Sequence, residues 1–148
     1  MFDTFQGLPL HALIVHATVV LLPLMCLLTV LVAVRPRLRE KYAWWTFAGD
    51  VAAIVLTWVT IRSGEDFYSH LSANPLIARH EQLGKQLIWF VIPLAITALI
   101  VALSTGKGPI AHAGTALSAV AAVLVLIWVV RVGHAGAEAV WQGVLPSK

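Results

Sequence analysis

The sequence has little charge and almost no cysteine. Only 11% of its 148 residues are charged, against about 25% in ordinary soluble domains, while 59% are hydrophobic and the mean hydropathy is +0.87. The single cysteine, Cys26, lies within an apolar run, which excludes an internal disulfide, a Cys-x-x-Cys redox pair and a Cys-x-x-Cys-His haem attachment. We therefore expect a chain whose normal solvent is lipid.

Common catalytic signatures are also missing. The sequence contains no His-Glu-x-x-His motif, no paired carboxylates within apolar runs, no Gly-rich phosphate loop and no nucleophile motif. A net charge of +3 and a pI near 9.4 could suggest a nucleic-acid partner. The basic residues are few, however, and most lie beside apolar runs, where they are typical of membrane-surface anchors. A hydrolase, a nucleotide enzyme and a nucleic-acid-binding protein are therefore unsupported.

Four apolar runs meet or approach the length of about 20 residues that crosses a bilayer as a helix. They cover residues 10–34, 44–61, 86–103 and 114–132. The third helix is expected to begin near Pro75, because Asn74 is a good N-cap and proline is favoured in the first turn. The sequence thus predicts an all-α fold, in which residues 1–148 form a single transmembrane domain, an integral membrane four-helix bundle.

Charge placement predicts the orientation. No positive charge precedes the first run, whereas Arg35, Arg37, Arg39 and Lys41 follow it in one short loop, which is the reverse of a cleaved signal peptide. The positive-inside rule places this loop in the cytoplasm. Both termini and the loop at 62–85 are then expected on the outer side of a bacterial cytoplasmic (inner) membrane.

Histidine is the most informative residue type. His11 and His16 fall in the outer part of the first run, His80 near the outer start of the third and His134 just past the outer end of the fourth. Three helices would thus bring imidazoles to one side of the membrane. His16 is a functional candidate because a histidine within a span is costly unless it faces the interior. Since His11 and His16 are about 140° apart on a helix, at most one is expected to face the bundle axis.

A b-type haem is one cofactor that these histidines could hold. It requires axial imidazoles from opposite sides of the macrocycle, with basic side chains near its propionates. We predict His16 and His80 as the axial pair, since His80 would lie on a rigid helix. His134 is the replacement ligand, because the backbone between its flanking glycines is expected to be loose. Arg79 and Arg131, next to His80 and His134, could pair with the propionates.

Two other interpretations remain open. In the first, His16, His80 and His134 hold a copper, zinc or iron ion, with Glu65 or Glu81 as a further ligand or as a hydrogen-bond acceptor that orients a histidine. In the second, the chain is an accessory subunit of a larger membrane complex, and its histidines only satisfy hydrogen bonds. The spacing of the histidines does not separate these cases.

Two further polar features belong to the second run. Asp50 lies about two turns into it, where a carboxylate is costly and often forms part of a proton path. Alternatively, Asp50 lies at the interface or bonds to a neighbouring helix. The charged segment 62–66 is expected to be a turn that closes this span.

Small residues recur on the last run, where Gly114, Ser118 and Ala122 lie at every fourth position. Such a stripe permits the close approach of a neighbouring helix. It could also leave room for a cofactor.

Four blocks of the sequence carry a family resemblance. They are LPLHALIVHATVVLLPL (8–24), RSGE (62–65), ARHEQLG (78–84) and GHAGAEAVW (133–141). In this order they resemble the signature blocks of a bacterial four-span membrane family, domain of unknown function 2231. The first block of that family usually reads His-Pro-x-x-x-His followed by an aromatic residue and proline. Here Ala12 replaces that proline, and the interval from His11 to His16 is one residue longer.

The resemblance also implies a functional context. Some relatives look like fusions of this membrane unit to Rieske-type iron–sulfur domains, which implies electron transfer in the cell envelope and favours haem over a static metal site. The expected protein is an electron carrier or redox subunit rather than a stand-alone enzyme. It would work with an envelope redox partner or as a homo-oligomer.

Overall fold

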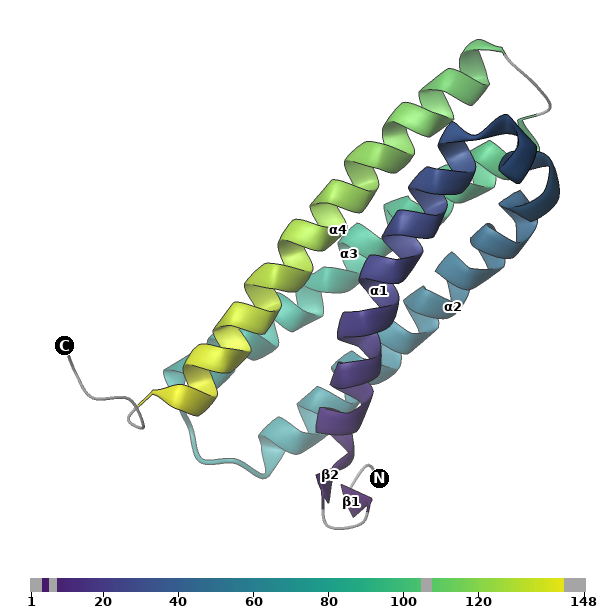
Figure 1. The fold of residues 1–148 in the computed structure, drawn as a ribbon. Helices are drawn as coiled ribbons and strands as arrows, with labels where there is room; N and C mark the ends of the chain where they lie inside the picture. The colour runs from purple at the N-terminus through teal and green to yellow at the C-terminus, as the bar shows by residue number, and fades with distance from the viewer. Residues whose placement is uncertain (1–3, 6–7, 105–107, 143–148) are drawn as a thin grey trace.

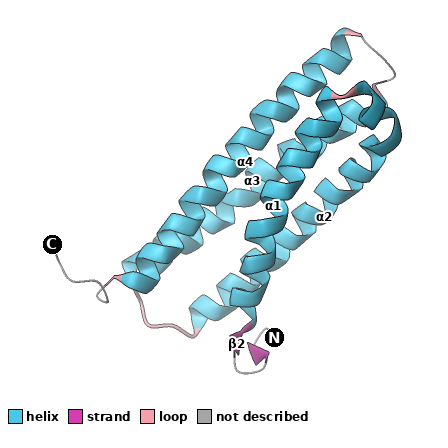
Figure 2. Ribbon diagram, viewed as in Figure 1, coloured by secondary structure: helices cyan, strands magenta, loops and turns pink. Residues whose placement is uncertain are grey.

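Four long helices make up almost all of the described chain (Figures 1 and 2). The computed structural model describes residues 4–5, 8–104 and 108–142. The helices are α1 (Leu10–Val34), α2 (Pro36–Ser69), α3 (Pro75–Leu103) and α4 (Pro109–Trp141). Before them, β1 (Thr4–Phe5) and β2 (Leu8–Pro9) form a short antiparallel pair. The prediction of an all-α chain with four helices is confirmed, apart from this strand pair.

Each helix is long and apolar enough to cross a membrane. The first predicted run coincides with α1, and the other three lie inside longer helices. With 34 residues, α2 would be about 50 Å long, whereas the hydrocarbon core is about 30 Å thick. The charged ends of the helices therefore extend beyond the apolar layer, and the chain is a multi-pass membrane protein.

Two predicted loops, and the prediction of a loose backbone in one further segment, are wrong because all three segments are helical. The basic segment after the first span joins α2 at Pro36, where proline fits the first turn. The expected turn at 62–66 is also part of α2, where Arg62 and Glu65 form an i,i+3 ion pair that suits a helix. The backbone around His134 is part of α4, which ends at Trp141. A glycine by itself costs a helix only about 1 kcal/mol relative to alanine, so Gly64 and Gly133 do not end theirs.

The helices form a four-cornered bundle in chain order. Helix α1 packs against α2 and α4, and α3 packs against the same two neighbours, so α1 and α3 lie on opposite corners. The beginnings of α1 and α3 and the ends of α2 and α4 share one end of the bundle, which we call the terminal end (Figure 1). The end that contains Val34, Pro36, Leu103 and Pro109 is called the opposite end. No described contact tests which end faces the cytoplasm, so the predicted orientation stays a prediction.

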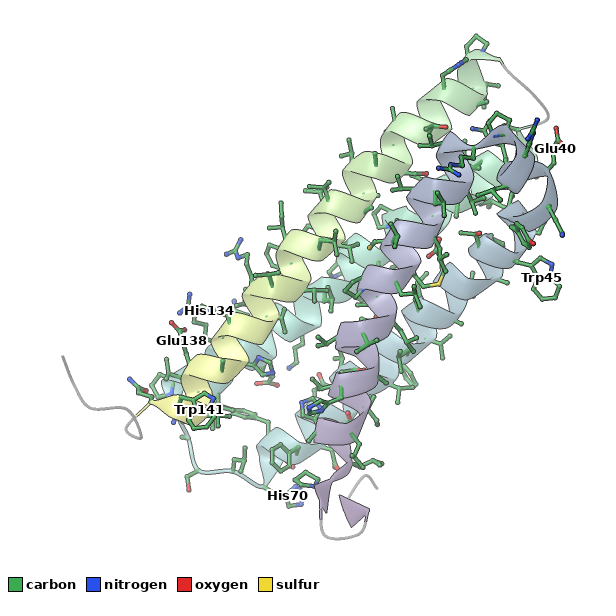
Figure 3. The ribbon with its side chains drawn as sticks, in the orientation of Figure 1. Glu40, Trp45, His70, His134, Glu138 and Trp141 are labelled. Atoms are coloured by element: carbon green, nitrogen blue, oxygen red, sulfur yellow. The ribbon has the colours of Figure 1, made fainter. Side chains whose placement is uncertain are left out.

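A fully enclosed apolar layer crosses the middle of the bundle. Leu22, Val91, Leu94 and Val125 all have 0% exposure and belong to one core cluster. On the outside, many large apolar side chains are exposed, as lipid contact requires; the indole of Trp45 near the opposite end is an example (Figure 3).

The small-residue stripe on α4 is buried, as its packing interpretation predicts. Gly114, Ser118 and Ala122 all face the interior. A Cβ atom placed on Gly114 would lie 3.2 Å from Ile100 and 3.3 Å from Val101. The stripe therefore allows α3 and α4 to approach closely toward the opposite end.

Candidate functional site

A cavity of about 110 Å³ lies inside the terminal half of the bundle. All four helices contribute to its mostly apolar walls. The lining residues include His11, Val15, Thr18, Val19, Thr60, Gly64, His80, Glu81, Lys85 and Gly133. Of the four candidate ligands, His11 and His80 line it.

His80 is held by helix α4. Helix α3 begins at Pro75, where Oδ1 of Asn74 accepts a hydrogen bond from the backbone N–H of Leu76 at 2.9 Å. One turn further on, Nδ1 of His80 lies 3.0 Å from the carbonyl oxygen of Val132. A carbonyl can only accept, so Nδ1 carries the hydrogen. Nε2 of the neutral ring therefore keeps its lone pair.

His11 is held in the same way by helix α2. Its Nδ1 lies 3.0 Å from Oγ of Ser63, and that hydroxyl donates its own hydrogen to the carbonyl of Thr60 at 2.9 Å. Oγ of Ser63 must therefore accept from Nδ1–H, and Nε2 of His11 again keeps its lone pair. The ring also stacks on Phe67, with 6.1 Å between ring centroids.

Each imidazole packs against a glycine of the helix that holds it. A Cβ atom on Gly64 would lie 2.9 Å from Cε1 of His11, and one on Gly136 would lie 3.0 Å from Cε1 of His80. Both distances are too short for an ordinary side-chain contact, so the two glycines provide the space for the rings. Sequence reasoning missed Gly64, Gly136 and Ser63, although glycine inside a helix is costly enough to be a signal.

The arrangement repeats in the two helical hairpins. In α1–α2, His11 comes from the first helix and its partners from the second. In α3–α4, His80 comes from the first helix and its partners from the second. The two imidazoles thus come from opposite corners of the bundle and line one cavity. A histidine whose second ring nitrogen donates to a protein oxygen is the typical arrangement for a metal ligand.

His16 takes no part in this cavity. It is exposed on the surface of α1, and its Nδ1 bonds to the carbonyl of Ala12 on its own helix. The expected angle between His11 and His16 holds, but His11 is the one that faces inward. The spacing of buried residues on α1 indicates which of the two histidines faces inward. Buried positions recur every three or four residues, and extending this spacing toward the N-terminus reaches position 11 and not position 16. The buried residues are Thr18, Leu22, Cys26, Thr29 and Ala33.

His134 also lies away from the cavity. Its side chain is 72% exposed and points outward from α4 beside Glu138, with which it forms a 3.3 Å ion pair when protonated (Figure 3). His16, His80 and His134 are therefore not brought together. Within the described ranges, no group of three or more His, Cys, Asp or Glu side chains is placed to share a metal ion.

The two predicted propionate partners are occupied elsewhere. Arg79 pairs with Glu138 at 3.2 Å on the surface. The guanidinium of Arg131 lies 4.6 Å from the ring centroid of Trp128. Neither arginine lines the cavity.

The cavity instead carries a charged rim formed by Glu81 and Lys85. Nζ of Lys85 lies 2.7 Å from Glu81 and 3.2 Å from Glu65, so it links α3 to α2. Glu65 also pairs with Arg62 at 3.1 Å. Its recorded partners are these two cations, and no recorded bond joins it or Glu81 to a histidine.

Asp50 does not line this cavity. It is fully buried and accepts a hydrogen bond from Oγ1 of Thr29 on α1 at 2.8 Å. The carboxyl therefore does bond to a neighbouring helix, as one of the two sequence interpretations held.

A family model described as "Predicted membrane protein (DUF2231)" matches residues 7–147. No curated protein and no solved structure matches the chain. The match confirms the resemblance of the sequence blocks. Its description assigns no activity, so a function has to be argued from the geometry.

Proposed function

We propose that this chain, which belongs to the DUF2231 family of predicted membrane proteins, is a small protein similar to a b-type cytochrome. It would hold a haem between His11 and His80. The iron of a bound haem would carry single electrons between a membrane donor and an envelope partner. The observation that supports this most is that His11 and His80 line one cavity from opposite helices, each with Nδ1 bonded and the lone pair of Nε2 kept.

The number of ligands favours haem over a conventional metal-ion site. The porphyrin supplies the in-plane nitrogens, so the protein has to add only two axial ligands. A structural or catalytic zinc ion usually takes three or four protein ligands. His11 and His80 are the two histidines at the cavity, which is the complement that a haem needs.

The proposal replaces His16 by His11 as the partner of His80. His11 has a bonded Nδ1 and lines the cavity, whereas His16 is exposed. Lys85 likewise replaces Arg79 and Arg131 as the cation that would pair with a propionate, since it lines the cavity, although it is also paired with Glu81 and Glu65.

The small volume of the cavity supports a second candidate for the bound group. The cavity of about 110 Å³ is smaller than the roughly 300–1,000 Å³ of pockets for drug-sized ligands. A macrocycle would have to move lining side chains such as Val15 and Val19, or spread the terminal ends of the helices. A single copper ion, for which imidazole is a suitable ligand, is far smaller than a macrocycle. The second candidate is therefore a copper ion held by the same two histidines.

Purification with four single variants tests both candidates. Wild-type protein should be red, with a shifted Soret band and sharp α and β bands on reduction, and with one haem in a pyridine haemochrome assay. His11→Ala and His80→Ala should each lose the haem. His16→Ala and His134→Ala, which remove exposed histidines of α1 and α4, should keep it.

The alternatives give different results. Colourless protein with one copper that is lost in the same two variants would replace haem by copper. Haem that survives in both His11→Ala and His80→Ala would overturn the site. Protein with neither cofactor would return the chain to the accessory-subunit interpretation.

A further inference from the structure

Asp50 lies at a contact between the first two helices, where Thr29 of α1 bonds to it. Its side chain has 0% exposure. A Cβ atom on the adjacent Gly49 would lie only 2.7 Å from Cε of Met25 on α1. The carboxyl is therefore shut between α1 and α2, with no space for a ligand of ordinary size.

Only one oxygen of this carboxyl is bonded. Oδ2 accepts the hydroxyl hydrogen of Thr29 at 2.8 Å. Oδ1 is buried and has no hydrogen-bond partner among the residues that the structure describes. A buried oxygen in this state is unusual enough to require an explanation.

No recorded contact among the described residues joins Asp50 to a cation. The half-buried cation of the same helix, Arg39, has recorded hydrogen bonds to the carbonyl of Ala33 and to Thr115 and none to Asp50. The titratable group that α1 presents here is the thiol of Cys26. The segments 86–103 of α3 and 114–130 of α4 contain no titratable side chain, and none of the recorded ion pairs involves Asp50. An ionised carboxylate without a cation is very costly in such a place, so the group is expected to neutralise itself.

We propose that Asp50 is an intramembrane proton-binding site, with the proton on Oδ1 and the carbonyl oxygen Oδ2 hydrogen-bonded to Thr29. The ligand of this site is a single proton. The site does not depend on the haem or copper proposed above, because it shares no residue with that cavity.

The proton site is separated from the cavity by the apolar layer. Leu22, Val91, Leu94 and Val125 each lie between the cavity-lining residues of their own helix and the opposite end of the bundle, and all four are fully buried. Polar side chains occur on the other side of this layer. Thr46, Thr97 and Ser118 are buried there, and each donates to a carbonyl of its own helix, which leaves its oxygen able to accept. Proton exchange is therefore assigned to the opposite end of the bundle.

Infrared spectroscopy of the full-length protein tests the proposal directly. Wild-type protein at neutral pH should show a carboxylic acid C=O band that is absent from Asp50→Asn. Glu40→Gln is the matched control, because Glu40 is an exposed carboxylate at the opposite end (Figure 3). That variant should keep the band unchanged.

A second variant keeps the proposal testable if Asp50→Asn does not fold. Thr29→Val removes the hydrogen bond to the carbonyl oxygen, so the band should persist and move to higher frequency. His11→Ala and His80→Ala should leave it in place even where they abolish cofactor binding. Absence of the band from wild-type protein, or its retention in Asp50→Asn, would overturn the proposal.

Discussion

The two halves of the bundle bury their polar side chains in different ways. In the terminal half, His11 and His80 each have one ring nitrogen bonded to a neighbouring helix, and both residues line a cavity. In the opposite half, Asp50 is tightly enclosed and one of its oxygens is bonded to nothing described. Both halves are polar inside, so polarity alone does not distinguish them. The two halves differ in the space beside these side chains. A cavity adjoins His11 and His80, and we propose a cofactor or ion there. Asp50 is packed so closely that we propose only a proton.

The largest effect is expected where a histidine has no room to move. In Gly64→Ala the new Cβ would lie 2.9 Å from His11, so the ring must shift or the helices must separate. We expect the free energy of unfolding to fall by about 1–3 kcal/mol, toward the upper end of that range. We also expect the bound cofactor to be lost. Thermal unfolding in detergent and cofactor content would measure both.

Gly133→Ala is the matched control for this change. Gly133 also lines the cavity, but a Cβ there would meet no atom within 4 Å. The variant should be neutral or gain up to about 1 kcal/mol, because alanine is the better helix former. Equal losses of stability in Gly64→Ala and Gly133→Ala would contradict the interpretation that Gly64 provides space for the imidazole ring of His11.

A smaller effect is expected from Thr29→Val in the opposite half. The change keeps the side-chain volume and removes the hydrogen bond to Asp50. We therefore expect the free energy of unfolding to fall by about 1–3 kcal/mol, toward the lower end of that range. Thr57→Val is the control, since Thr57 is equally buried and bonds to Ala53 of its own helix. If Thr57→Val proves as costly as Thr29→Val in the same unfolding assay, the bond to Asp50 contributes nothing particular.

Ser63→Ala should affect binding more than folding. It removes the acceptor for Nδ1–H of His11, which frees the ring to turn and to change tautomer. We expect a stability loss of about 1 kcal/mol and a cofactor affinity lowered about 10- to 100-fold, measured by titration of the cofactor-free protein. Ser69→Ala, which removes an exposed hydroxyl of the same helix, should leave the affinity unchanged; a matching drop there would contradict the assigned role.

The smallest effect is expected at the charged rim. Glu65→Gln breaks contacts with Lys85 and Arg62. All three side chains are partly exposed, so the loss should stay below about 1 kcal/mol and shrink further at high salt. Unfolding at low and high ionic strength would measure it, and a large salt-independent loss would show that the rim belongs to the buried site.

The sequence allowed the fold to be predicted because lipid imposes a simple rule on it. Apolar runs of sufficient length become spans, and all four were found. The helix ends at 36–43 and 62–69 were mistaken for loops because they leave the apolar layer and carry charge. Polar composition marks the membrane boundary there and does not mark the end of the helix.

The candidate site was predictable only in part. The positions along the chain placed His11 and His80 near the same end, but the choice between His11 and His16 depends on how α1 is rotated against its neighbours. The hydroxyl of Ser63 and the glycines behind the rings become meaningful only once the helices are paired. Orientation also remains a prediction from charge, and a C-terminal reporter that is active only in the cytoplasm would overturn it.

The repeated hairpin arrangement has a consequence for biogenesis. Each hairpin carries a histidine together with the groups that fix its ring, so each half of the site is complete once its own pair of helices has been inserted. Helices α1 and α3 have few contacts with each other, so a group bound by both histidines would connect two units that are otherwise joined only through α2 and α4. Cofactor capture would then be the last step of assembly, and it would select chains whose two hairpins have found each other.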